Sequence, residues 1–435
     1  MSEASALEVD VLVVGGGMAG AIAALAARDA GATVVLARRA PGATALSSGG
    51  ISVAKDLSAL PGEPLSWRRG PLESARRLTA LRPEHPYAVV GPAIERLGEA
   101  LGFAARELAD VLVPPLDRQR VVMTPFGTAV PCALVQPTME AGDLLAAPAR
   151  IAVVGLSGHL GFDASLVADG IERLVPLGAP AATVVEIDPF GPALASARPH
   201  ELARALEPPG AAEAAGELLR AALPAGCGVA LFPPVLGLDL RARVADRIAA
   251  RAGLPVAETL ADVPSVPGAR LHAAIEARLA AAGVAVLEGR VEGARGPGEP
   301  ARVGGREVRA RSWVLATGRF VGGGIQRWGA LEEATLGLPV EAAEGCESGA
   351  DLARRPATSL TVRERRAAQP LLSAGVRVDS SLRPLDDRGK PVHARLFAAG
   401  AVIGGHEQAA DGTGLGVAIL TGHLAGRTAA AGRAG

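Results

Sequence analysis

The stretch LVVGGGMAGAIAALAARDAGATVVLARR, residues 12–39, decides the fold. Residues 9–14 form an almost unbroken apolar run, which is typical of a strand buried on both faces. The glycines that follow fit the pattern G-x-G-x-x-G at Gly15, Gly17 and Gly20. In that pattern the first glycine permits a tight turn, the second lets a phosphate approach the backbone, and the third packs the helix closely on the strand.

An Ala-rich helix follows the glycines and runs to about Ala30, where Gly31 ends it. A second strand at residues 33–36 completes a βαβ unit of roughly 30 residues. The N-terminus of such a helix presents free N–H groups and the positive end of its dipole. The unit therefore predicts a site for the phosphate of a nucleotide or flavin. A Gly-rich turn in another kind of α/β sheet is the alternative.

The end of the second strand departs from the usual pattern. This strand normally ends in Asp or Glu, which accepts hydrogen bonds from a ribose hydroxyl. Here the chain reads Ala37-Arg38-Arg39, and an alanine side chain accepts no hydrogen bond. Arg38 and Arg39 are instead suited to meet a phosphate. Either the site holds its cofactor differently, or the cofactor has no adenosine ribose.

Composition excludes several classes of protein. With 435 residues, 49% of them hydrophobic, the chain can bury a large core in two or three domains. A formal net charge of −1 argues against a nucleic-acid-binding surface. The three cysteines, Cys132, Cys227 and Cys346, form no C-x-x-C pair, so we expect no iron–sulfur cluster and no metal site. The N-terminus does not read as a signal peptide and no run of 18 apolar residues occurs, so we expect a cytoplasmic protein.

The order of elements predicts a discontinuous cofactor domain. A second α/β run begins near residue 151, and strand–glycine elements return at residues 312–318 and 396–400. The predicted fold class is α/β, with a discontinuous Rossmann-like domain and an inserted α/β domain. The predicted boundaries are 1–60 for the first part, 61–265 for the insert, and 266–435 for the returning part, with a variable segment near 341–370.

Several glycine-rich loops are candidates to contact the cofactor. The loop PGATALSSGGI, residues 41–51, leaves the second strand and offers hydrogen-bonding groups, although an ordinary turn explains it equally well. The loop at residues 400–416 precedes a C-terminal helix and can direct N–H groups at an anionic flavin edge. Beyond Gly15, Gly17, Gly20 and Arg38, the predicted cofactor-binding residues are Ser47, Ser48, Gly49, Gly318, Gly400, Gly412 and Gly414.

These motifs together carry a resemblance to a known family. The chain resembles the two-domain flavoproteins that include fumarate reductase and L-aspartate oxidase. Within that class it is most similar to the B subunit of anaerobic glycerol-3-phosphate dehydrogenase. The resemblance covers nearly the full length and rests on the order and spacing of separated segments, among them residues 15–20, 47–49, 85–87, 153–158, 315–318 and 396–400.

The resemblance implies an enzyme that works with partners. A homologous flavin subunit would form the catalytic unit together with this chain. An iron–sulfur subunit would anchor this unit at the inner face of the membrane and pass electrons to quinone. The substrate implied is glycerol 3-phosphate, oxidised to dihydroxyacetone phosphate. The cofactor implied is FMN, which lacks the adenosine ribose, with FAD as the alternative.

Within the resemblance, four residues are candidates for the chemistry. Arg383 and Arg270 lie in matched segments and are candidates to clamp the substrate phosphate. His406 and His85 are candidates for the base that takes the hydroxyl proton. His406 stands where the family pattern has no histidine, so its role is not carried over from the family. A buried, structural tyrosine is favoured over a substrate contact for Tyr87, the only tyrosine in the chain.

Two other functions remain open. The chain could hold a flavin without catalysing the oxidation, as an electron-transfer or assembly subunit. It could also be another FAD oxidoreductase of the fumarate reductase-like class.

Overall fold

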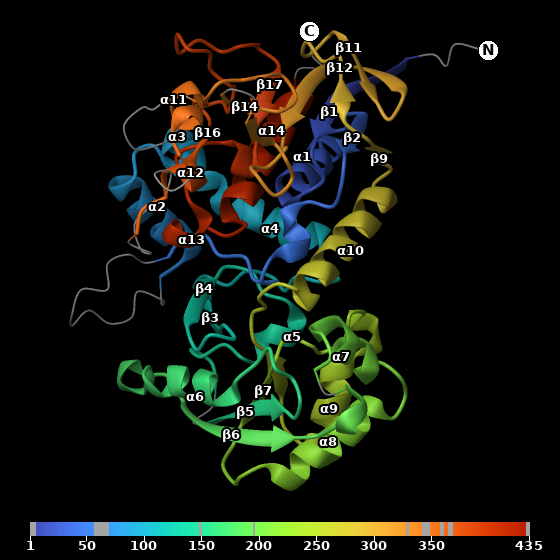
Figure 1. Ribbon diagram of the computed structural model, residues 1–435, viewed down its shortest axis with the longest axis vertical. Coiled ribbons are helices and arrows are strands. Elements are labelled where there is room, and N and C mark those ends of the chain that lie inside the picture. The colour runs from blue at the N-terminus through green and yellow to red at the C-terminus, as the bar shows by residue number, and fades with distance from the viewer. Residues whose placement is uncertain are drawn as a thin grey trace.

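The computed structural model describes residues 6–55, 69–147, 150–194, 196–327, 330–341, 349–356, 361–363 and 369–431. These residues form two domains stacked along the longest axis of the molecule, with the first and last described residues in the first domain (Figure 1). The predicted fold class, a discontinuous Rossmann-like α/β domain with an inserted α/β domain, is confirmed. Parts of the predicted variable segment near 341–370 lie outside the described residues.

The first domain is built on a parallel sheet of non-consecutive strands. Its strands lie side by side in the order β9, β2, β1, β12, β17, with β1 paired in parallel to both β2 and β12. This corresponds to the order 3-2-1-4-5 of a dinucleotide-binding fold. The bounds are Leu7–Val14 for β1, Val34–Arg38 for β2, Ala285–Glu288 for β9, Arg306–Leu315 for β12 and Leu396–Ala398 for β17. Two antiparallel strands, β10 (Val291–Glu292) and β11 (Pro300–Val303), extend the sheet beyond β12.

Helices α1 (Met18–Asp29) and α14 (Gly416–Ala431) pack against each other beside the sheet. Nearly every residue of both helices is buried, and glycines on α14 allow the close approach. A Cβ atom added to Gly422 would lie 2.5 Å from the Ala19 carbonyl oxygen, and one added to Gly426 would lie 2.2 Å from that of Ala23. The C-terminal helix is therefore fixed directly on the first helix of the chain.

The inserted domain contains a second, four-stranded parallel sheet with the order β6-β5-β7-β8. The strands are β5 (Arg150–Leu156), β6 (Ala181–Ile187), β7 (Val229–Phe232) and β8 (Val256–Glu258). The helices of this domain are α6 (Ala164–Glu172), α7 (Pro199–Leu206), α8 (Ala211–Ala222) and α9 (Val244–Ala252). Helix α10 (Val266–Ala281) leads from this domain back to β9 of the first sheet (Figure 1).

Several elements lie between or beside the two sheets. Helices α2 (Pro71–Leu81) and α4 (Leu97–Glu107) place Leu78 and Leu101 in the same core as the first sheet, although both helices lie within residues 61–265, which the sequence prediction assigned to the insert. They pack there because their apolar faces meet the first domain; α4 lies against α14. The remaining elements are α3 (Pro86–Val89), β3 (Arg120–Met123), β4 (Ala129–Cys132), α5 (Pro137–Glu140), β13 (Ile325–Arg327), β14 (Leu331–Glu333), β15 (Val340–Glu341), α11 (Gly349–Arg354), α12 (Pro370–Ser373), β16 (Gly375–Val376) and α13 (Gln408–Asp411).

The contact between α1 and α14 makes a testable prediction. Gly426→Ala should lower the free energy of unfolding by about 1–3 kcal/mol, because the new methyl group would overlap the Ala23 carbonyl. Gly102→Ala is the matched control, since a Cβ at this position on α4 has no atom within 4 Å and helix propensity should raise stability by up to ~1 kcal/mol. Urea denaturation of both variants measures the difference. Equal effects of the two substitutions would contradict the described packing.

Candidate functional site

The candidate site lies at the carboxyl edge of the first sheet. The chain turns sharply after β1, β12 and β17, at Gly15, Gly318 and Gly400. Backbone hydrogen bonds of 2.8 Å join the strand ends at these turns, from Ala316 N to Val14 O and from Ala399 N to Leu315 O. Ligands of open α/β sheets bind at this edge, so three of the predicted glycines lie where a cofactor is expected.

The three glycines of the first turn have separate physical roles. Gly15 has a φ angle of +122°, and a Cβ atom there would lie 2.1 Å from the Ala316 carbonyl oxygen. A Cβ atom on Gly20 would lie 1.9 Å from the oxygen of Gly15. At Gly17 the nearest atom to an added Cβ is Thr44 Oγ1, 3.5 Å away. Gly15 and Gly20 are thus required by packing, whereas a Cβ atom at Gly17 would make only ordinary van der Waals contacts.

The N-terminus of α1 is suited to an anion. The cap residue Gly17 has no side chain, and the first turn contains no acidic residue. The Met18 N–H donates to Thr44 Oγ1 at 2.8 Å, which places a hydroxyl group from the 3-10 turn Ala43–Leu46 at the helix end. Free N–H groups, the helix dipole and this hydroxyl together fit a phosphate group of a dinucleotide.

Arg38 is engaged differently from the prediction. Its guanidinium group forms ion pairs with Glu276 of α10 and Glu288 of β9. The side chain of Ala37 is fully buried in the sheet. Because two carboxylates already surround the charge of Arg38, a direct contact between this residue and a cofactor phosphate is no longer favoured.

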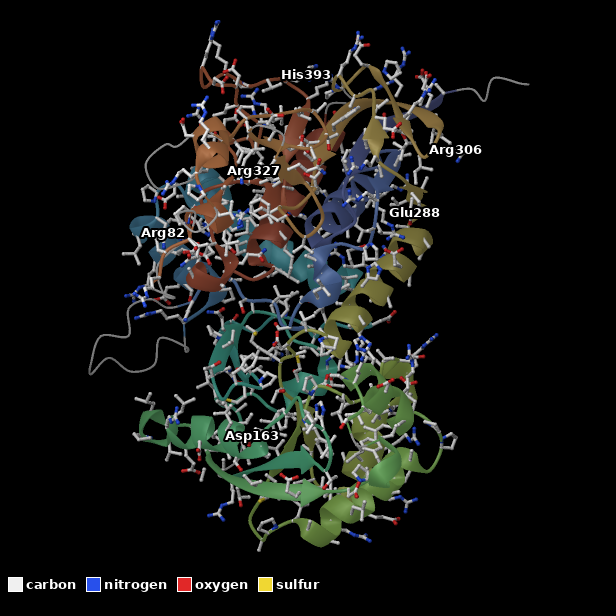
Figure 2. The ribbon with its side chains drawn as sticks, in the orientation of Figure 1. Arg82, Asp163, Glu288, Arg306, Arg327 and His393 are labelled. Atoms are coloured by element: carbon white, nitrogen blue, oxygen red, sulfur yellow. The ribbon has the colours of Figure 1, made fainter. Side chains whose placement is uncertain are left out.

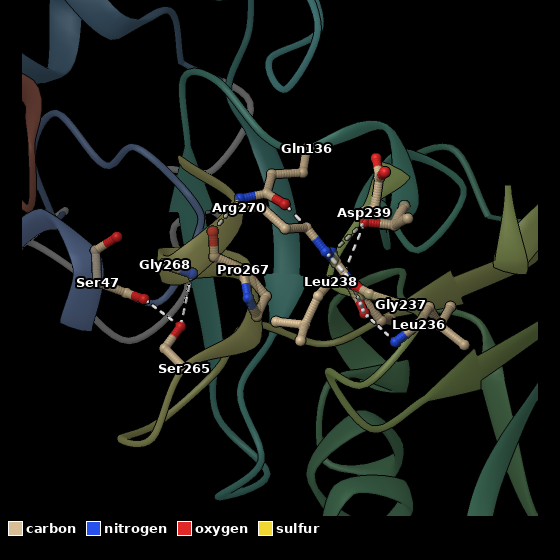
Figure 3. Close-up of polar contacts among 12 residues, drawn as sticks. Ser47, Gln136, Leu236, Gly237, Leu238, Asp239, Ser265, Pro267, Gly268 and Arg270 are labelled. Atoms are coloured by element: carbon tan, nitrogen blue, oxygen red, sulfur yellow. Dashed lines mark hydrogen bonds and ion pairs between the residues drawn. The ribbon is translucent and has the colours of Figure 1, made fainter. Parts of the chain in front are cut away.

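The predicted loop Ser47–Ser48–Gly49 is held in place by the segment that enters α10 (Figure 3). Ser265 Oγ donates to the Ser47 carbonyl at 2.6 Å, and Ala261 N donates to the Ser48 carbonyl at 3.0 Å. The buried Ser47 hydroxyl itself has no hydrogen-bond partner among the described residues. This loop is fixed from behind, which leaves the hydroxyl group for a ligand.

Two predicted phosphate clamps are committed to other partners. Arg270 forms a buried ion pair with Glu258. It also donates to the Gly237 carbonyl at 2.6 Å and to Gln136 Oε1 at 3.2 Å (Figure 3). This network joins α10 to the inserted domain. Arg383 forms an ion pair of 2.7 Å with Asp379 in its own turn. Both guanidinium groups already have a carboxylate partner within the protein, so the predicted clamp on a substrate phosphate is no longer favoured for either residue.

The structure does bring the two predicted histidines together. The rings of His85 and His406 meet edge to face with centroids 5.6 Å apart, and the ring of Tyr87 lies 4.7 Å from that of His85. Arg319 joins them through hydrogen bonds of 3.2 Å from Nη2 to the carbonyls of Ile403 and His406. We call His85, Tyr87, Arg319 and His406 the polar cluster.

The loops around the polar cluster hold the other predicted glycines. Lys55 N donates to the Asp411 carbonyl at 2.8 Å, and Gly416 N donates to the Ser52 carbonyl at 3.1 Å. A Cβ atom on Gly412 would lie 2.2 Å from Lys55 Cβ, and one on Gly414 would lie 3.3 Å from Ser52 Cβ. Gly412 and Gly414 therefore bring the loops that begin at residues 47 and 400 together.

The polar cluster contains an unusual concentration of unsatisfied groups. His85, Tyr87 and His406 are fully buried. The atoms His85 Nε2, Tyr87 Oη, Arg319 Nε and both ring nitrogens of His406 have no hydrogen-bond partner among the described residues. Buried polar atoms are nearly always paired in folded proteins, so this group fits a bound polar ligand or water.

Burial controls the charges in the polar cluster. Burial, and then the nearby Arg82, lowers the pKa of His85 to about 3, and burial together with Arg319 holds the pKa of His406 well below its usual range. Burial also lowers the pKa of Arg319 to about 10, with Glu407 opposing the shift. At neutral pH the histidines are therefore neutral and Arg319 carries the charge.

Arg319 supplies the positive charge of the site, and the sequence did not lead us to predict this residue. No carboxylate in the described part of the chain lies within ion-pair distance of it. A mostly buried cation without an acidic partner is costly, and an anionic ligand would offset that cost. The sequence does hold a signal, because Arg319 directly follows the glycine turn after a buried strand.

Comparisons with known proteins identify the family of this chain. A family model described as an FAD binding domain matches residues 10–417. The probable B subunit of an anaerobic glycerol-3-phosphate dehydrogenase from Halobacterium salinarum is 31% identical over 445 residues, covering 98% of each chain. The corresponding B subunit from Yersinia pestis is 28% identical over 435 residues, covering 95% of this chain and 96% of its own.

Solved structures are more distant. A 3-ketosteroid-Δ4-(5α)-dehydrogenase from Rhodococcus jostii matches 99% of this chain and 98% of its own at 16% identity, with a TM-score of 0.39. An open flavocytochrome c3 fumarate reductase matches 98% of this chain and 78% of its own at 13% identity, with a TM-score of 0.41. These scores are too low to support a conclusion. The family model and the full-length relatives suffice: the chain belongs to the FAD-binding flavoproteins, in the family of anaerobic glycerol-3-phosphate dehydrogenase B subunits.

Proposed function

We propose that this chain is the flavin-binding subunit of a glycerol-3-phosphate dehydrogenase and takes part in oxidising glycerol 3-phosphate to dihydroxyacetone phosphate. The observation that carries the proposal is the match of 98% of both chains to a relative of that name. The polar cluster supports it, because it combines an unpaired cation with neutral imidazoles beside the predicted cofactor edge.

FAD is the cofactor that we propose. The matching family model is one for FAD, and FMN, the first choice from the sequence, finds no support. Gly17 and Thr44 would hold the pyrophosphate at the end of α1, and Gly318 and Gly400 would admit the cofactor between the turns. Bound FAD would supply the acceptor for the electrons of the substrate.

The polar cluster would bind the substrate. The guanidinium group of Arg319 would pair with the substrate phosphate, which satisfies its buried charge. His406 would accept the hydroxyl proton; burial lowers its pKa most, and the phosphate would offset the smaller lowering by Arg319. His85, with Nδ1 fixed by the Tyr87 N–H at 3.1 Å, would offer Nε2 to the same ligand.

A non-catalytic flavin protein is the second candidate. The depressed pKa values of His85 and His406 favour it, since a general base works best with a pKa near the operating pH. In that case the oxidation would take place in the partner, and the flavin here would relay electrons.

The proposed partners are a homologous flavin subunit, which completes the catalytic unit, and an iron–sulfur subunit that passes electrons to quinone. None of the described helices combines the length and apolarity needed to cross a membrane. We propose a location at the cytoplasmic face of the membrane, reached through the iron–sulfur subunit.

The flavin assignment predicts opposite results for two substitutions at one position. Gly17→Glu should abolish flavin binding, because the carboxylate would extend toward the proposed phosphate position. Gly17→Ala should leave the fold intact, because the nearest atom to an added Cβ is 3.5 Å away. Absorbance at flavin wavelengths, with thermal unfolding as the check on folding, measures both. A yellow Gly17→Glu protein would contradict the site.

The substrate assignment predicts a selective effect at Arg319. In the co-expressed complex, Arg319→Met should raise KM for glycerol 3-phosphate roughly ten- to hundredfold, since a hydrogen-bonded charge is lost. Flavin content should not change. Arg306→Met, at the exposed opposite end of β12, is the matched control (Figure 2). Dye reduction by glycerol 3-phosphate measures KM.

The same assay separates the two candidate functions. An unchanged KM in Arg319→Met, with flavin retained, would favour the non-catalytic role. Dye reduction by the isolated chain would exclude that role.

A further inference from the structure

The missing acid of the second strand has a counterpart on the next strand. Strands β2 and β9 pair in parallel, and in their register Arg38 lies opposite Glu288. Each is the last residue of its strand, so both lie at the carboxyl edge of the sheet. Glu288 follows Arg38 by 250 residues in the chain, so no local motif includes it.

The side chain of Arg38 connects this edge to the glycine turn. A Cβ atom added to Gly16 would lie 2.7 Å from Arg38 Cδ, so the arginine stem lies directly on the turn. Its guanidinium group donates from Nε to Glu288 Oε1 at 2.8 Å, while Nη2 lies 2.7 Å from the same oxygen. Nη1 pairs with Glu276 on α10.

The net charge of Arg38, Glu276 and Glu288 together equals that of the usual arrangement. One guanidinium and two carboxylates leave one net negative charge, the charge of the single Asp or Glu that normally ends the second strand. The group therefore repels a phosphate overall and attracts hydroxyl donors. The site therefore keeps a net negative charge although β2 ends in Ala37-Arg38 without an acidic residue.

We propose that Glu288, positioned by Arg38, is the ribose-binding carboxylate of this protein. The inference rests on the proposed cofactor FAD. Both contacts from Arg38 go to Oε1 of Glu288, and its side chain remains 62% exposed, which leaves Oε2 able to accept from a ribose hydroxyl. Glu276 is less suited, because it lies in the third turn of α10 and its side chain is 32% exposed. Figure 2 shows Glu288 at the edge of the first domain, where α10 enters β9.

Comparison of two flavins tests the proposal. FMN lacks the adenosine ribose, so a residue that binds this ribose affects FAD alone. In Glu288→Ala the Kd for FAD should rise roughly ten- to hundredfold, the range expected for loss of a hydrogen bond to a charged group. The Kd for FMN should stay constant. Quenching of flavin fluorescence on titration of the flavin-free protein gives both constants.

Two further variants sharpen the test. Glu292→Ala is the matched control, because this exposed glutamate on β10 lies outside the Arg38 group. The double variant Arg38→Glu with Glu288→Arg moves the carboxylate to β2 and keeps the ion pair between β2 and β9, although it loses the pair with Glu276, so it should bind FAD more tightly than Glu288→Ala does.

The outcomes are distinct. Equal Kd values for FAD in Glu288→Ala, Glu292→Ala and the parent would overturn the proposal. An equal loss of FMN and FAD binding in Glu288→Ala would also overturn it, because it indicates damage to the fold. A parent protein that binds FMN but not FAD would also overturn it. A parent protein that binds neither flavin would overturn the proposed function itself.

Discussion

The parallel pairing of β1 with β12 is the contact on which the rest of the structure depends. It places Val14 beside Leu315, so the first glycine turn and the turn at Gly318 lie at one edge although most of the chain separates them. Pairing of β12 with β17 adds the turn at Gly400. The chain leaves the first sheet after β2 and returns to it at the neighbouring strand β9. The segment between these strands can be long, because the entropic cost of closing a loop rises only slowly with its length.

The second constraint is the burial of the polar cluster. Burial keeps His85 and His406 neutral and leaves Arg319 charged, with no carboxylate of the described residues at ion-pair distance. Electrostatic interactions are stronger at a buried site of low dielectric constant than in water. A bound anion would therefore interact strongly with Arg319, and the same burial makes the cluster selective for a ligand that brings its own negative charge.

The sequence predicted the fold well because the deciding signals are local. The apolar run before Gly15 and the Ala-rich helix after it correspond to β1 and α1, and the returning glycine turns at Gly318 and Gly400 lie beside them. The prediction failed where side chains meet partners far away in the chain. Arg270 with Glu258, and Arg38 with Glu276 and Glu288, are tertiary pairs that no spacing rule reveals. Arg319 was overlooked because its burial becomes visible only when the loop at Ile403 folds over it.

The carboxyl edge of the first sheet is where we place FAD, and the proposed chemistry depends on that placement. Its most direct test is the mass of the small molecule released when the purified chain is denatured. The mass of FAD, at one molecule per chain, is the predicted result. A colourless protein that takes up neither flavin, or one that releases FMN, would contradict the placement.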